Sequence, residues 1–166
     1  MEARAKLFGH PIHQMLIAFP LGLLAMALFF DIGALILNHH QGLFSASYYM
    51  IAAGVVTGLL AAVFGLMDFL KIPSGTRAKR VGAMHGGGNV VVVVLFAASW
   101  LLRRGGHPAD PPTLAIGLAA LGAGIATITG WLGGELVDRL GVGVDDGAHL
   151  DAPSSLSGRP AAERSR

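Results

Sequence analysis

The chain has 166 residues, of which 53% are hydrophobic and 13% are charged, with a mean hydropathy of +0.61 and a formal net charge of +2. A soluble globule of this length needs more charged residues to cover its surface, so the composition excludes that class and indicates an integral membrane protein. Because the chain contains no cysteine, disulfides and thiolate-bound zinc or iron–sulfur centres are excluded. The basic residues are grouped between apolar runs, a pattern that indicates membrane topology and not nucleic-acid binding.

Four apolar runs predict an all-α polytopic membrane protein, a bundle of four transmembrane helices in up-down-up-down order. The first run, 11–37, begins at Pro11, which suits the first helical position, and contains Asp31 as its only charged residue. Because Asp31 comes near the end of the run, it is expected at the membrane interface. The other spans are expected at 48–70, 81–102 and 113–137. Residues 1–10 form a short leading segment, and 138–166, rich in Gly, Pro, Ser, Asp and Arg, are expected to form a flexible polar tail.

The basic residues also predict an orientation. Most of them flank one side of the four spans: Arg4, Lys6, Lys71, Arg77, Lys79, Arg80 and Arg139. Only Arg103 and Arg104 adjoin the spans on the other side. The positive-inside rule therefore predicts that both termini are cytoplasmic, in the plasma (inner) membrane of a bacterium. Spans one and three then begin, and spans two and four end, in the same leaflet.

Polar residues capable of binding a ligand gather at that depth. Spans one and three open with His10, His13, His85 and Asn89, and spans two and four end with Asp68 and Glu135. Three imidazoles and two carboxylates from four helices favour a buried site, because unpaired polar groups are costly in lipid. Each residue also has a plainer interpretation. The histidines can cap helix ends, and the two carboxylates can pair with Lys71, Arg77 or Arg80.

Several of these motifs together resemble an uncharacterised bacterial family, a four-span membrane domain of unknown function that opens with an HPxH motif. The resemblance covers about residues 8–144 and is carried by Gly9–Gln14, Phe19-Pro20, Gly65–Asp68, His85 and Gly130–Val137. Some related domains are joined to Rieske-type iron–sulfur modules, which implies a place in membrane electron transfer. The family brings no established activity or ligand.

The first functional hypothesis is a redox subunit that holds a b-type haem. Axial ligation requires two histidines on different helices, with small residues where the macrocycle meets backbone. His13, or His10, would face His85 across the diagonal of the bundle, and Gly86 and Gly87 would border the haem. Such a subunit would serve a redox partner protein.

The second hypothesis is a non-haem iron or zinc site. Its ligands would be drawn from His10, His13, Asp68, His85 and Glu135, with Asn89 and Trp131 supporting the ligands from behind. Two alternatives contain no cofactor: a proton or ion pathway through the same titratable groups, and a purely structural subunit. Glycine-rich helix faces, such as Gly130 with Gly134, would also allow pairing with a second copy in the bilayer. Whether the chain is an enzyme is left open.

Overall fold

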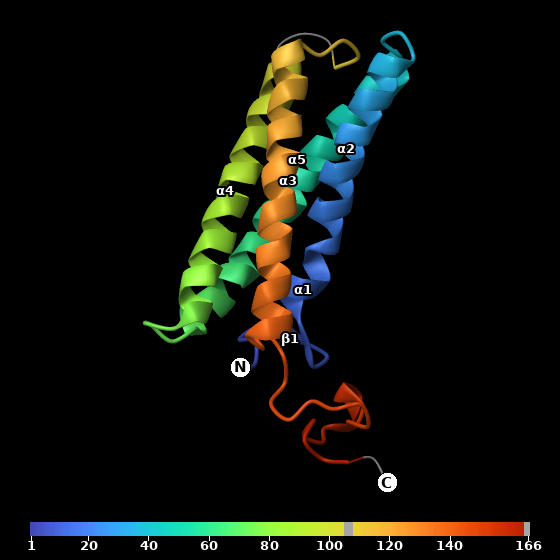
Figure 1. Cartoon of the computed structure of the whole chain (residues 1–166). Helices are drawn as coiled ribbons and strands as arrows, with labels where there is room; N and C mark the ends of the chain where they lie inside the picture. The colour runs from blue at the N-terminus through green and yellow to red at the C-terminus, as the bar shows by residue number, and fades with distance from the viewer. Residues whose placement is uncertain (105–107, 165–166) are drawn as a thin grey trace.

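The computed structural model describes residues 1–104 and 108–164 (Figure 1). In this part of the chain, four helices are long and apolar enough to cross a membrane: Ile12–Ile36, Gln41–Lys71, Arg77–Arg104 and Thr113–Arg139. The predicted all-α class with four spans is confirmed. A two-stranded ribbon, β1 (Lys6–Leu7) and β2 (His10–Pro11), precedes the first span, and a short 3-10 helix, η2 (Ser155–Ser157), lies in the tail.

The first span consists of α1 (Ile12–Leu16) and α2 (Ala18–Ile36), separated at Ile17. The interruption has a local cause. Pro20 has no backbone N–H and so cannot bond the carbonyl of Leu16, four residues earlier. The second span, α3 (Gln41–Lys71), begins well before the predicted residue 48 because the His40 ring accepts a hydrogen bond from the N–H of Leu43 and caps the helix. α4 (Arg77–Arg104) and α5 (Thr113–Gly134) follow, and a π-helical turn, η1 (Glu135–Arg139), extends α5.

The helices form two antiparallel hairpins. The first consists of α1, α2 and α3, and the second consists of α4, α5 and η1. α2 packs along α3, and α4 packs along α5 to the same extent, whereas α3 and α4 join the hairpins and α2 touches α5 only lightly. A central apolar cluster fills the interior: Leu24, Ala27, Ile51, Val92, Phe96 and Ala119. Figure 1 shows both termini at one end of the bundle, which we call the histidine end because His13 and His85 lie there; the opposite end is the distal end.

The two hairpins repeat the same close contact between their helices. A Cβ added to Gly54 of α3 would come within 2.5 Å of the Leu24 side chain, and one added to Gly122 of α5 would come within 3.0 Å of the Phe96 ring. Glycine permits this close approach, and a larger residue would require the facing side chain to move. In both hairpins the large side chain comes from the first helix and the glycine from the second, so the hairpins are structural repeats that run in the same direction.

A buried ion pair at the distal end belongs to the same repeat. Arg103 donates to both carboxylate oxygens of Asp31, at 2.8 and 2.6 Å, and both side chains are fully buried. The guanidinium also donates to the hydroxyls of Ser47 and Ser99, each at 3.3 Å. Asp31, expected at the membrane interface, thus lies inside the bundle. Burial is possible because a bidentate partner and two hydroxyls replace its hydration.

Asp31 and Arg103 are also repeat equivalents of each other. The sequence separation between them is 72, and the same separation relates Leu24 to Phe96. Equivalent residues face each other only if a half-turn rotation relates the repeats, with its axis passing between them. The bundle therefore has a pseudo-twofold axis along its length, the arrangement of parallel repeats in membrane proteins.

Candidate functional site: a histidine pair on the repeat axis

His13 of α1 and His85 of α4 form a second pair of equivalents, because the separation between them in the sequence equals that between Asp31 and Arg103. Their ring centroids are 6.5 Å apart and the ring planes are perpendicular. Both side chains are partly buried. The repeat axis that passes between Asp31 and Arg103 at the distal end therefore passes between two imidazoles at the histidine end.

Each ring is held by the backbone of the other helix of its own hairpin. His13 Nδ1 lies 2.8 Å from the carbonyl oxygen of Ala61, and His85 Nδ1 lies 2.8 Å from that of Thr129. A carbonyl oxygen only accepts, so Nδ1 carries a proton in both rings. In the neutral rings this arrangement leaves the lone pair on Nε2, the nitrogen that can bind a metal.

A glycine lies one turn beyond each of these carbonyls. A Cβ added to Gly65 would come within 2.8 Å of His13 Cε1, and one added to Gly133 would come within 3.1 Å of His85 Cε1. Each imidazole edge therefore rests on helix backbone. Gly65 and Gly133 are equivalents in the same register as Gly54 and Gly122. The carbonyl and the glycine together fix where each ring lies, in both repeats.

Asn89 distinguishes the second hairpin from the first. Its Nδ2 lies 3.2 Å from His85 Nε2 and 3.0 Å from the His85 carbonyl oxygen, and its Oδ1 accepts from Thr129 Oγ1 at 3.0 Å. The equivalent residue in the first hairpin is Ile17, which has no polar side-chain group to offer. The structure thus brings together three of the residues selected from the sequence, His13, His85 and Asn89.

The two carboxylates have other partners. Asp68 accepts from the backbone N–H of Arg4 at 2.6 Å, and Glu135 accepts from Arg77 at 2.6 Å. For Glu135 this is the plainer interpretation, a pair with the neighbouring loop. Within residues 1–104 and 108–164, no three His, Asp or Glu side chains lie close enough to hold a metal ion together. The structure does not assemble the mixed ligand set from these residues.

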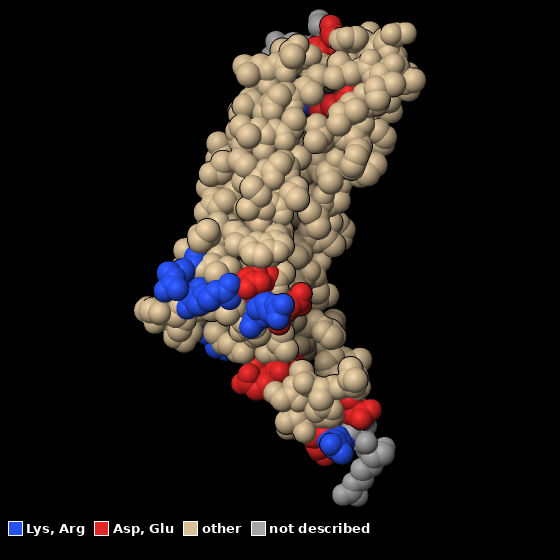
Figure 2. Space-filling view, in the orientation of Figure 1, with Lys and Arg blue, Asp and Glu red and all other residues tan. Residues whose placement is uncertain are grey.

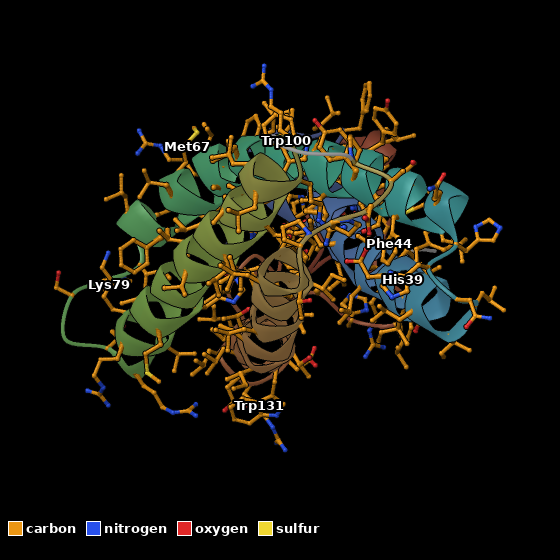
Figure 3. The ribbon with its side chains drawn as sticks, turned by 90° about the horizontal axis from the view of Figure 1, so that it is seen from above. His39, Phe44, Met67, Lys79, Trp100 and Trp131 are labelled. Carbon is orange, nitrogen blue, oxygen red and sulfur yellow. The ribbon has the colours of Figure 1, made fainter. Side chains whose placement is uncertain are left out.

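Other candidates lie away from the pair. His10 is exposed in β2 and its Nε2 is 3.4 Å from Ser155 Oγ. Trp131 is 67% exposed, and Figure 3 shows it at the periphery of α5. A Cβ added to Gly86 or Gly87 would meet nothing within 4 Å, so neither borders a packed site. The glycine of this run that makes a close contact is Gly88, where a Cβ would clash with Thr129.

An apolar groove of about 690 Å³ opens between α2 and α5. Among the residues that line it are Pro20, Leu24, Phe96, Ala123, Gly124, Thr127 and Gly130. By the repeat, its counterpart is the contact between α4 and α3, which is more extensive. The difference is encoded in α5, which has Ala123, Gly124 and Thr127 where α3 has Val55, Val56 and Leu59. Small residues thus keep one of two equivalent interfaces open.

Charged side chains of both signs gather at the histidine end. Figure 2 shows lysines and arginines there together with aspartates and glutamates, while the long helical surface between the two ends is almost free of charge on the face in view. Lys79 bonds the carbonyl oxygen of Phe69 at 2.8 Å and lies over its ring, and Arg77 reaches Glu135. Both of these cations therefore already have partners within the chain.

The family described as Predicted membrane protein (DUF2231) matches residues 9–146, from the glycine before His10 to beyond the last helix. The chain belongs to this family. The DUF2231 match contains both hairpins, the Asp31–Arg103 ion pair and the His13–His85 pair. No curated protein and no solved structure matches the chain. DUF2231 membership establishes a membrane protein with four candidate spans, and the histidine pair is the feature from which its function must be argued.

Proposed function

We propose that this protein is a membrane electron-transfer subunit that binds one b-type haem, with His13 and His85 as the axial ligands. The observation that carries the proposal is that the two rings have the same tautomer. Both Nδ1 atoms are committed to backbone carbonyls, at 2.8 Å each, which leaves both Nε2 lone pairs for a metal. Histidines that bind metals have their other nitrogen oriented in this way.

The spacing of the rings supports this assignment. A metal bonded to both Nε2 atoms at about 2 Å, plus the half-width of each ring, separates two imidazole centroids by about 6 Å. The centroids of His13 and His85 are 6.5 Å apart. Among the described residues, no third His, Asp or Glu joins the two rings in a cluster that could hold a metal. Two histidines alone fit haem better than zinc or non-haem iron, which take three or more protein ligands.

An apolar groove lies next to the pair, although neither histidine lines it. This groove between α2 and α5 has a volume within the roughly 300–1,000 Å³ of cofactor sites. It extends to Gly130, the neighbour of the residue that bonds His85. Arg77 and Lys79 precede His85 on α4 by about two turns, and they would supply positive charge for the propionates on leaving their present partners, Glu135 and the Phe69 carbonyl.

When bound, a haem supplies a one-electron couple at the histidine end. The protein's own residues hold the two imidazoles in fixed tautomers through the Ala61 and Thr129 carbonyls. The bilayer and the apolar core exclude water from the site. Asn89 Nδ2 lies 3.2 Å from His85 Nε2, so this amide would have to move aside for His85 to hold a metal through that nitrogen. A single centre near one membrane face serves exchange with a redox partner at that face, which the positive-inside rule assigns to the cytoplasm.

The test is an absorption spectrum of the protein purified in detergent, with haem added, before and after reduction by dithionite. We expect a Soret band and sharp bands of a six-coordinate low-spin haem after reduction. Each should be lost in His13→Ala and in His85→Ala and retained in His40→Ala, a histidine at the distal end. A wild-type protein that takes up no haem, or an equal spectrum in His85→Ala, would overturn the proposal.

A further inference from the structure

The His13–His85 pair and the Asp31–Arg103 pair both connect the first span to the third. In each span the histidine and the charged residue are the same number of residues apart. The stretch from His13 to Asp31, which contains the interruption at Ile17, has as many residues as the continuous helix from His85 to Arg103. Each stretch makes about five complete turns and rises about 27 Å, so the histidine and the charged residue of each helix point to the same side. One face of the first span and one face of the third therefore carry a histidine at one end and a charge at the other.

The remaining contact between these two spans is weak in the described part of the chain. α2 packs along α3 and α4 packs along α5, while α2 and α4 lie diagonally across the bundle. Between the two pairs the interior consists of aliphatic and aromatic side chains such as Leu24 and Phe96. Such contacts are non-directional, and in lipid they carry little hydrophobic driving force. A small slide of α2 along α4 would cost these diagonal contacts little, whereas the packing of α3 against α4 would resist it.

The ion pair is directional in contrast. The planar guanidinium of Arg103 meets both oxygens of Asp31 at once, and Ser47 and Ser99 hold it from two sides. A slide of one turn, about 5.4 Å, would separate the two charges inside a water-free bundle. This contact permits one register of α2 against α4.

We infer that Asp31 and Arg103 are positioning residues for the histidine pair: by locking α2 to α4 at the distal end, they set the separation of His13 and His85 at the other. The inference deepens the proposed haem site and rests on it for its purpose. The register itself is measurable without haem, so the two ideas can fail separately.

The test uses the absence of cysteine from the chain. Spin labels on Met15→Cys and Met84→Cys, both exposed at the histidine end of α1 and α4, report the distance between the two spans by pulsed electron resonance. The label pair is placed in four backgrounds: wild type, Asp31→Asn, the apolar pair Asp31→Leu with Arg103→Leu, and a charge reversal. In parallel, added haem is assayed for its low-spin fraction.

The apolar pair separates positioning from stability. Replacing a buried ion pair by apolar residues leaves no unpaired charge, so this variant is expected to stay folded. We expect its distance distribution to broaden about twofold or more, and its low-spin haem fraction to fall, because the directional contact is gone. A folded apolar variant with the wild-type distance distribution would overturn the inference.

The charge reversal uses the repeat. Asp31→Arg and Arg103→Asp exchange the charges, and Ala27→Ser with Ala115→Ser supplies hydroxyls at the equivalents of Ser99 and Ser47. Ala27 and Ala115 are fully buried at those places. We expect this variant to recover the wild-type distance distribution even if Asp31→Asn does not fold. Failure to recover it also contradicts the inference, and a restored distance without haem in any background would contradict the proposed function alone.

Discussion

His13 rests on Gly65 so closely that a methyl group on the glycine would come within 2.8 Å of the ring. The same ring donates to the carbonyl of Ala61, one turn earlier on the same helix. The backbone of α3 thus fixes the position of the His13 ring. The backbone of α5 fixes the His85 ring in the same way, through Gly133 and Thr129.

Gly65→Ala is therefore expected to displace the His13 ring and to reduce haem binding severalfold, with a loss of roughly 1–3 kcal/mol in stability from overpacking. Gly133→Ala should act in the same direction but more weakly, because its added carbon would lie 3.1 Å from His85. Haem titration and thermal unfolding in detergent measure both effects. Gly117→Ala is the matched control, since a Cβ there meets nothing within 4 Å; an equal effect of all three changes would contradict the assignment.

Asp31→Asn should destabilise the bundle by about 3–5 kcal/mol, because it leaves the Arg103 charge buried without its partner. Denaturant unfolding followed by circular dichroism measures the change. The control is Arg104→Gln, one residue further on α4 and exposed, for which surface changes of at most about 0.5 kcal/mol are expected. A stability of Asp31→Asn equal to that of the control would show that the pair is solvated.

Filling the groove should show whether it holds the cofactor or only affects the packing of the helices. Ala123→Val, Gly124→Val and Thr127→Leu together copy the residues of α3 onto α5 and should close the interface between α2 and α5, raising stability by roughly 1 kcal/mol through added contacts. Haem uptake should fall severalfold, if the groove takes the macrocycle. The reciprocal variant, Val55→Ala with Val56→Gly, lies outside the groove and should lower stability without a comparable loss of uptake. Equal uptake in the filled variant would place the macrocycle elsewhere.

The contact between the leading segment and the tail should depend on alkaline pH. Hydrogen bonds to Asp145, and secondarily to Glu2, raise the pKa of Lys6 above its ordinary 10.5. A raised pKa means that this stabilisation is fully present below the ordinary value and is lost as the pH rises through the folded value. Limited proteolysis of the tail should accelerate across that interval while helix content stays constant. Lys6→Gln should be cleaved at the faster rate at neutral pH; a pH profile unchanged by this substitution would contradict the role of Lys6.

The spans could be predicted because hydropathy over roughly twenty residues measures the main constraint that lipid imposes. The meeting of His13 and His85 also follows from topology, since alternate spans begin at the same end and lie diagonally opposite. The directions of Asp68 and Glu135 could not be predicted. Each ends a helix, where a backbone N–H of Arg4 or the side chain of Arg77 can reach it from outside the bundle.

The partners of the histidines were also beyond sequence patterns, because Ala61 and Thr129 act through backbone carbonyls that every residue possesses. The burial of Asp31 was not predicted for a different reason: its partner, Arg103, is distant in the sequence and was assigned to a loop. One signal could have revealed the pairing of Asp31 with Arg103. His13 precedes Asp31 by the same number of residues as His85 precedes Arg103. This match indicates a repeat whose equivalent residues meet.

The repeat limits how this sequence can evolve. Two identical hairpins paired about this axis would bring aspartate against aspartate, or arginine against arginine, in a water-free interior. Opposite charges at positions 31 and 103 are compatible only with halves that differ in sequence. A substitution at either position alone leaves the other charge buried without its partner, so the two positions must change together.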